Sequence, residues 1–291
     1  MRVTPGLPPQ PRQQSAYGFT VTGLPAVREL VPGALPGAPV VRVLVEPEPA
    51  TAPPLRPLDA DGGVRRLGGG QLLSLDRARR TATFFGPPLA PDLLAHPYLG
   101  PVSTAFNRWA GREAFHAGAC VAGERAWAVL GPRTAGKSTL LAALAARGIP
   151  VLADDIVVTD GIVVHRGPRC VDLREAPPLP GLGDLYAARD ASRLRLPLPD
   201  APAEVPLGGW FFLSWGDDLA ITPVPAARLV GELASRRAWR HLSSDPSLLL
   251  ALATLPAWEL RRPRRWDATD ATLDLLVRAP FGAEPAAPVA R

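Results

Sequence analysis

The sequence predicts an α/β fold in which a mixed sheet with helices follows a small, mostly β N-terminal domain. Two observations carry this prediction. In the first third of the chain, short apolar runs are separated by Pro- and Gly-rich turns, a pattern typical of antiparallel strands. Further on, strand-like runs alternate with Leu- and Ala-rich stretches of helical character. We expect flexible tails at 1–14 and 280–291, a β-rich domain at 15–105 and an α/β domain at 106–279.

The composition is that of a globular protein. Of the 291 residues 47% are hydrophobic, which excludes global disorder. The net charge is +5, but no basic run carries interleaved aromatic residues, so we expect no nucleic-acid partner. The longest apolar stretch, at 248–258, is far shorter than the ~20 residues that cross a bilayer, and no signal peptide is evident. We expect a cytoplasmic protein without a membrane partner, and a homo-oligomer remains open.

The predicted N-terminal domain consists of short strands and one connecting helix. A segment rich in Pro, Asp and Gly at 50–63 has the composition of a loop. The helix is expected over 99–110, where it leads into the second domain. The predicted strands are Tyr17–Val21, Val40–Val45, Leu72–Leu75 and Thr81–Phe85.

The second domain contains a strand, a glycine-bounded loop and a helix in direct succession, at 126–130, 131–138 and 138–147. Gly148 and Pro150 end that helix. Two apolar runs at 210–214 and 219–224 predict a hairpin across 216–218. Other strands are expected at Ala114–Val121, Val151–Ala153, Ile156–Val158, Ile162–His165 and Arg169–Leu173, and other helices at Ala226–Arg237, Pro246–Leu252 and Asp267–Val277.

The loop between that strand and helix reads GPRTAGKS and matches G-x-x-x-x-G-K-[ST]. Its glycines let backbone N–H groups converge on phosphate oxygens, and the helix N-terminus adds partial positive charge. Lys137, the only lysine of the chain, supplies a point charge for the phosphates, and the Ser138 hydroxyl can bind Mg²⁺. We therefore expect ATP and Mg²⁺, with the nucleotide bound by Gly131, Arg133, Thr134, Ala135, Gly136, Lys137, Ser138 and Thr139.

Two other positions carry candidate catalytic groups. Asp154 and Asp155 end an apolar strand 17 residues after Lys137, a spacing that lets a helix and a turn bring this strand end beside the loop. Paired Asp residues often only cap a turn, but phosphoryl transfer to a hydroxyl needs such carboxylates beside the phosphates, so we favour a functional role. His116 lies 21 residues before Lys137 in an apolar strand, where a buried core histidine is the alternative.

This combination resembles the HPr serine kinase/phosphorylase family, in particular a divergent HPr-kinase-like branch, some of whose members modify peptides. The matching residues are the His-x-Gly of His116 and Gly118, the loop GPRTAGKS and the segment ARGIPVLADD, so the resemblance covers about 112–175. It implies a P-loop-containing mixed sheet, similar to the C-terminal domain of HPr kinase, for 106–279. It further implies that Asp154 is the catalytic acid/base, that His116 contacts and tunes it, and that Asp155 helps to hold the metal.

One signature of the family is altered. Its Glu-x-Arg-Gly has its nearest match at Asp172-Leu-Arg174-Glu175, where Asp replaces Glu and the glycine is absent. We take Asp172 as a hypothetical metal ligand beside Ser138 and Asp155. The missing glycine favours an acceptor other than HPr, namely an unidentified hydroxyl-bearing protein, peptide or metabolite.

The sequence therefore predicts an ATP-dependent kinase. One alternative is a catalytically weak nucleotide-binding regulatory or partner protein. Another is an ATPase or GTPase switch, although a base-reading N/T-K-x-D motif is impossible because Lys137 is the only lysine. The arginines at 261–265 are expected on a solvated surface. Trp210, Trp215, Trp258 and Trp266 are expected in a core or an interface rather than as stacking platforms.

Overall fold

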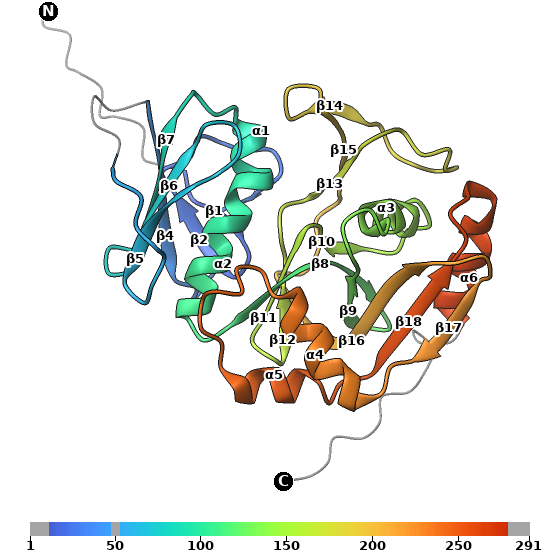
Figure 1. Ribbon diagram of the computed structural model, residues 1–291. Coiled ribbons are helices and arrows are strands. Elements are labelled where there is room, and N and C mark those ends of the chain that lie inside the picture. Colours follow the sequence, from blue (N-terminus) through green and yellow to red (C-terminus); the bar gives the residue numbers. More distant parts are fainter. Residues whose placement is uncertain (1–11, 48–52, 279–291) are drawn as a thin grey trace, which may run out of the picture.

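The computed structural model describes residues 12–47 and 53–278 and has a mixed α/β fold built around two large sheets (Figure 1). The α/β prediction is confirmed at this level. Of the expected tails, residues 1–11 and 280–291 lie outside the described residues. Gln14 was placed in the tail, but it begins the first strand and is buried, because its side-chain amide bonds the backbone at Pro25 and Val27.

The first sheet has seven strands in the order β3-β1-β2-β4-β7-β6-β5, with parallel pairing of β2 with β4 and of β4 with β7. Tyr17 was expected within a strand but occupies the turn between β1 and β2, with a φ of 54°. The strands β1, β3 and β5 were not anticipated. The strands are β1 (Gln14–Ala16), β2 (Phe19–Thr22), β3 (Val31–Pro32), β4 (Val40–Pro47), β5 (Gly62–Arg66), β6 (Leu72–Asp76) and β7 (Thr81–Gly86).

One helix joins the first sheet to the second. The chain passes through α1 (Pro91–Leu93) and the π-helical turn η1 (Leu94–Tyr98) into α2 (Leu99–Trp109), which lies between the two sheets (Figure 1). Leu99 and Phe106 of α2 share a hydrophobic core with Phe84 of the first sheet and with Ala114 and Ile156 of the second. This core therefore continues across the predicted boundary between residues 105 and 106.

The second sheet has eight strands, and five of them pair in a ring, β8–β11–β12–β16–β9–β8. The expected hairpin at 210–224 is wrong, because β18 lies between β16 and β17 and pairs with both. The strands are β8 (Glu113–Ala122), β9 (Arg125–Leu130), β10 (Val151–Ala153), β11 (Ile156–Thr159), β12 (Val163–His165), β16 (Glu204–Trp215), β17 (Ala220–Pro223) and β18 (Ala257–Arg262).

Helices cover both faces of the second sheet. On one face, leucines of α3 (Lys137–Ala146) share a core with α6 (Thr269–Arg278). On the other face, α4 (Ala226–Arg236) and α5 (Pro246–Leu252) pack around Trp210. A third sheet also packs on α3; it consists of β13 (Cys170–Leu173), β14 (Tyr186–Ala188) and β15 (Arg193–Pro197) (Figure 1). Within the described part of the chain, no helix combines the length and apolarity needed to cross a membrane.

Candidate active site

The glycine-bounded loop connects β9, a central strand of the second sheet, to the start of α3. Gly136 precedes the helix with a φ of 78°, a conformation that favours glycine, and a Cβ there would lie 2.5 Å from a nitrogen of Arg262. No side chain caps the N-terminus of α3. The first N–H groups of this helix are thus not engaged by a capping side chain and are of the kind that binds anions.

A buried arginine and a tryptophan hold the outer side of the loop. Arg262 Nη2 donates to the carbonyl oxygens of Ala135 at 3.1 Å and Gly136 at 2.9 Å, and its guanidinium lies 4.5 Å from the centre of the Trp215 ring. Trp215 Nε1 donates to the Thr134 carbonyl at 3.0 Å. Burial lowers the pKa of Arg262 to about 10. Arg262 was expected in solvent; it is 6% exposed, because β18 runs beneath the loop.

Lys137 lies inside the curve of the loop. Its Nζ donates to the carbonyl oxygens of Gly131 at 3.0 Å and Pro132 at 3.2 Å. Burial lowers the pKa of Lys137, while the nearby charges of Asp154 and Asp155 act in the opposite direction. The ammonium group is therefore partly desolvated, a state in which its attraction to an anion is strengthened.

The two aspartates lie where the chain bends between β10 and β11. Both strands pair with β8. The pairing of β10 ends where Ala153 lies opposite Ala119, and the pairing of β11 begins where Ile156 lies opposite His116. At the bend Asp155 adopts a φ of 69°. The bend gives the two carboxylates different surroundings, since Asp154 is buried and Asp155 is exposed.

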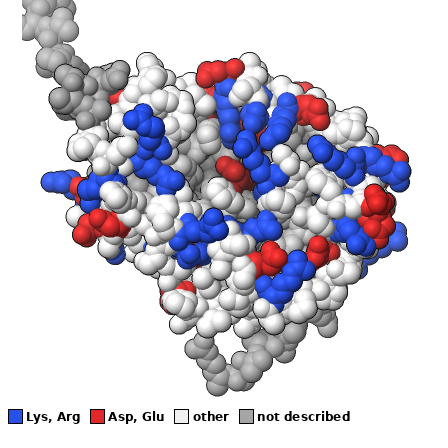
Figure 2. All heavy atoms as spheres, viewed as in Figure 1, with Lys and Arg blue, Asp and Glu red and all other residues white. Residues whose placement is uncertain are grey.

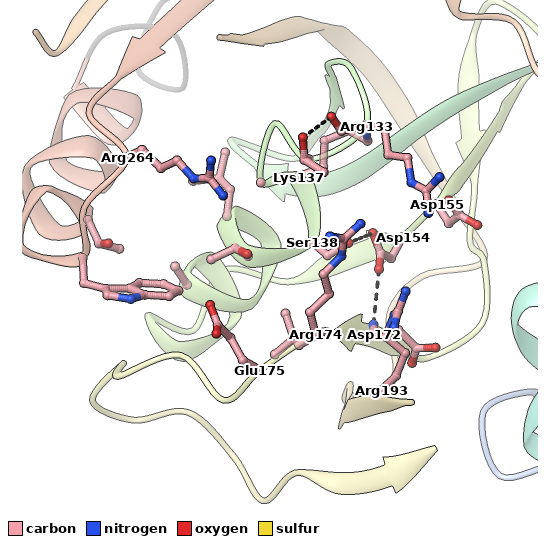
Figure 3. A pocket seen from close by; sticks show the side chains of 18 of the residues that line it. Arg133, Lys137, Ser138, Asp154, Asp155, Asp172, Arg174, Glu175, Arg193 and Arg264 are labelled. Carbon is pink, nitrogen blue, oxygen red and sulfur yellow. Dashed lines mark hydrogen bonds between the residues drawn. The ribbon is translucent and has the colours of Figure 1, made fainter. Parts of the chain in front are cut away.

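Asp154 links the loop to β13 (Figure 3). Ser138 Oγ donates to Asp154 Oδ1 at 3.0 Å, and the backbone N–H of Asp172 donates to Oδ2 at 3.3 Å. Burial, followed by the negative charge of Asp155, raises the pKa of Asp154 to about 7; the two hydrogen bonds act against this shift. Asp154 is thus a carboxyl group that titrates near neutral pH.

Asp172 lines the cavity and is bound by two arginines. Arg195 donates to both of its carboxylate oxygens, at 2.6 and 2.9 Å, and Arg189 Nε donates to Oδ2. Although burial acts in the opposite direction, the hydrogen bonds of Arg195 and the neighbouring positive charges lower the pKa of Asp172. Both oxygens therefore accept charged hydrogen bonds, and the metal-ligand role of Asp172 stays a prediction.

Arg195 extends this network to the N-terminal part of the chain. Its fully buried guanidinium donates to Glu29 Oε1 at 2.8 Å and to the His96 carbonyl at 2.9 Å. The same Glu29 oxygen accepts a hydrogen bond of 2.6 Å from the Tyr186 hydroxyl. Sequence reasoning missed Arg195, Glu29 and His96, and no local signal marks them, since each is defined by partners far away in the chain.

The structure does not place His116 where it was expected. His116 is exposed on β8 and does not line the cavity that contains Asp154. The histidine in that cavity is His96, whose Nε2 is 3.8 Å from Asp172 Oδ2. Burial, followed by the charge of Arg189, lowers the pKa of His96 to about 4, so its ring is neutral at physiological pH.

These groups surround a cavity of about 550 Å³ that includes Arg133, Thr134 and the residues from Gly136 to Thr139. The other two residues that were predicted to bind the nucleotide, Gly131 and Ala135, are buried and do not line the cavity. On the face seen in Figure 2, Lys and Arg side chains surround an acidic group near the middle. Cations outnumber carboxylates in the lining: Arg133, Lys137, Arg174, Arg189, Arg193, Arg262, Arg264 and Arg265 against Asp154, Asp155, Asp172 and Glu175. The excess of positive charge suits an anionic ligand.

No family model matches the chain, and no curated protein matches it. Among solved structures, it is similar to the Hpr(Ser) kinase/phosphatase from Coxiella burnetii, at 11% sequence identity and a TM-score of 0.32, over 57% of this chain and 94% of the other. This is a distant structural likeness.

Proposed function

We propose that this protein is an ATP-dependent kinase that transfers the γ-phosphate of ATP to a hydroxyl group of a protein, peptide or small molecule. The observation that carries the proposal is the 3.0 Å hydrogen bond between Ser138 and Asp154. It places a buried carboxyl group beside the start of α3, inside a cavity with an excess of cations. Phosphoryl transfer to a hydroxyl uses a carboxyl group of this kind as a base.

The residues divide into two roles in this reaction. The loop backbone and Lys137 would bind the phosphates, with Arg133 and Arg174 beside them. Asp154 would take the proton of the acceptor hydroxyl while the oxygen of that hydroxyl bonds to the γ-phosphorus. The bond between the γ-phosphorus and the bridging oxygen of the β-phosphate would break, which releases ADP. A pKa of about 7 suits this role, because a general base works best when its pKa lies near the working pH.

The oxygen groups of the cavity fit Mg²⁺, which prefers hard oxygen ligands and keeps several water molecules. Ser138 and Asp155 both line the cavity and would contribute to its binding. Residues 12–47 and 53–278 contain no group of three or more His, Cys, Asp or Glu side chains that could hold a metal. The remaining ligands would therefore be phosphate oxygens and water, and the bound ion would neutralise part of the triphosphate charge.

A second candidate function is nucleotide binding without efficient turnover. It is favoured by the departures from the expected catalytic set, since Asp172 is bound by two arginines and His116 lies outside the cavity. A regulatory or partner protein of this kind would need the loop and Lys137 but not the carboxyl group of Asp154.

The test is ADP release from Mg·ATP, with and without a dialysed lysate and a small-metabolite pool. Lys137→Ala should abolish nucleotide binding. Asp154→Asn should keep binding but reduce transfer by roughly 10²–10⁴-fold, the usual contribution of a positioned base. Asp61→Asn, at an exposed aspartate directly before β5, is the matched control.

Four outcomes decide between the candidates and test the two assignments. ADP release that rises with one fraction and is lost in both site variants supports the kinase. Binding without turnover in every mixture supports the regulatory alternative. ADP release that persists at the wild-type rate in Asp154→Asn refutes the catalytic assignment, and unchanged ATP affinity in Lys137→Ala refutes the assignment of the loop.

A further inference from the structure

One aromatic residue of the cavity has no part in the proposed phosphate transfer. Trp266 begins the 3-10 turn η2 (Trp266–Ala268), which follows β18 and leads into α6. Its side chain lines the same cavity as Lys137 and Ser138 and is 41% exposed. We expected Trp266 in a core or an interface. The structure instead leaves its ring on the wall of a polar cavity.

The neighbouring tryptophan is engaged in a different way. Trp215 also lines the cavity, but the guanidinium of Arg262 stacks on its ring, and its Nε1 donates a hydrogen bond to the Thr134 carbonyl of the loop. For the side chain of Trp266, no hydrogen bond, cation contact or ring contact is found among the described residues; only its backbone carbonyl accepts a hydrogen bond, from Thr269. Trp215 therefore supports the loop, and the indole of Trp266 remains available to a ligand.

The loop determines which end of the cavity a nucleotide base would occupy. In a site of this kind the lysine reaches the β- and γ-phosphates, and the backbone of the loop surrounds the α- and β-phosphates. With Asp154 at the γ-phosphate, the base must lie at the far side of the α-phosphate. From Lys137 the cavity follows α3 as far as Ala143, a rise of about 9 Å along the helix axis.

The segment that carries Trp266 forms that far side. In Figure 3, Arg264 enters the cavity from the side opposite to Asp155, Asp172 and Arg193. Trp266 follows Arg264 by two residues and lines the cavity together with Thr269 of α6. An aromatic face with cationic neighbours at this position suits a flat ring attached to a phosphate chain.

We propose that Trp266 is the stacking platform for the base of the bound nucleoside triphosphate, and that the base is a purine, since the larger ring covers more of the indole. This inference rests on the proposed function, because it takes the direction of the nucleotide from the loop. Base–aromatic stacking contributes roughly 5- to 150-fold to affinity. Trp266 would thus distinguish ATP from a bare chain of phosphates.

The experiment compares the affinities of ATP, CTP and inorganic tripolyphosphate by titration calorimetry in the presence of Mg²⁺. The proteins are the wild type, Trp266→Ala, Trp266→Phe and Lys137→Ala. Trp266→Ala should weaken ATP binding roughly 5- to 150-fold and change tripolyphosphate binding by less than about 2-fold. Trp266→Phe, which keeps an aromatic face, should retain most of the ATP affinity. Unchanged tripolyphosphate binding also shows that the variant is folded.

The failures of the two proposals are distinguishable. If Trp266→Ala weakens the binding of ATP and of tripolyphosphate equally, or weakens the binding of neither ligand, the stacking platform is refuted while the assignment of the loop stands. Equal wild-type affinity for ATP and CTP refutes the preference for a purine. If the wild type binds none of the three ligands, or if Lys137→Ala binds them all normally, the proposed function itself fails and the platform fails with it.

Discussion

Replacement of Asp154 by asparagine should stabilise the protein at pH 8 much more than at pH 5. The pKa of this carboxyl group rises from 3.8 to about 7 on folding, mainly through burial. A shift of this size changes the free energy of unfolding by about 4 kcal/mol between low pH, where the carboxyl group is protonated in both states, and high pH, where it is ionised in both. Because the folded-state pKa is the higher one, this contribution to stability is present below about pH 4 and is lost as the pH rises through 7. Wild-type Asp154 therefore destabilises the folded protein most above neutral pH.

Asparagine removes the charge but can keep the contacts. Its side-chain oxygen can accept from the Asp172 N–H, and its amide nitrogen can donate to Ser138 Oγ, whose hydroxyl accepts as readily as it donates. The two proteins then differ chiefly in the ionisation of residue 154. Between pH 5 and pH 8 the unfolded wild-type carboxyl gains about 2–3 kcal/mol more from ionisation than the folded one does.

The assay is urea unfolding of the wild type and Asp154→Asn at pH 5 and pH 8, with Asp61→Asn as an exposed control. The gain in the free energy of unfolding should be about 2–3 kcal/mol larger at pH 8 than at pH 5, and the control should show no such difference. If the wild type and Asp154→Asn depend on pH in the same way, the carboxyl group is not desolvated. Its assignment as a base that titrates near neutral pH would then be refuted.

Two further predictions concern the same cavity. Lys137→Arg should lose most of the ATP affinity in titration calorimetry, because a planar fork does not fit where Nζ lies between the carbonyls of Gly131 and Pro132; full affinity would show that any cation serves there. Burial is the main cause of the raised pKa of Asp154, and the charge of Asp155 adds to it. Asp155→Asn removes that charge, so the acid limb of the pH–rate profile of phosphate transfer should move to lower pH; an unmoved limb would mean that another group controls it.

The sequence predicted best those features that depend on neighbouring residues. The loop at 131–138 and the bend at Asp154 and Asp155 follow from a local motif and a local pair. Strand β18 was missed because its Glu259, Arg261 and Arg262 are typical of a surface, whereas the loop above it binds Arg262. The hairpin at 210–224 was wrong because the parallel pairing of β16 with β18 joins distant segments, which alternation along the chain does not reveal.

In the candidate site, too, the residues that belong to local motifs were predicted and those defined by distant partners were not. Lys137, Ser138, Asp154 and Asp155 lie around one cavity, and each stands in or next to a recognisable motif. The roles of the cavity's other groups depend on long-range partners. Asp172 accepts hydrogen bonds from Arg195, and the buried guanidinium of Arg195 is also bound by Glu29, 166 residues away, and by the His96 carbonyl.

The network around Arg195 bears on how this protein can be divided or recombined. A chain that began at residue 106 would keep the loop and both aspartates of the bend, but it would lack Glu29 and the His96 carbonyl. Because the Asp92 carbonyl would also be absent, the guanidinium of Arg195 would lose three of its acceptors, and Ala114 and Ile156 would lose their contacts with the first sheet and with most of α2. The N-terminal region therefore stabilises the rest of the protein: gene fusion or domain shuffling that separated it from the half with the glycine-bounded loop would be expected to disrupt the half that remained.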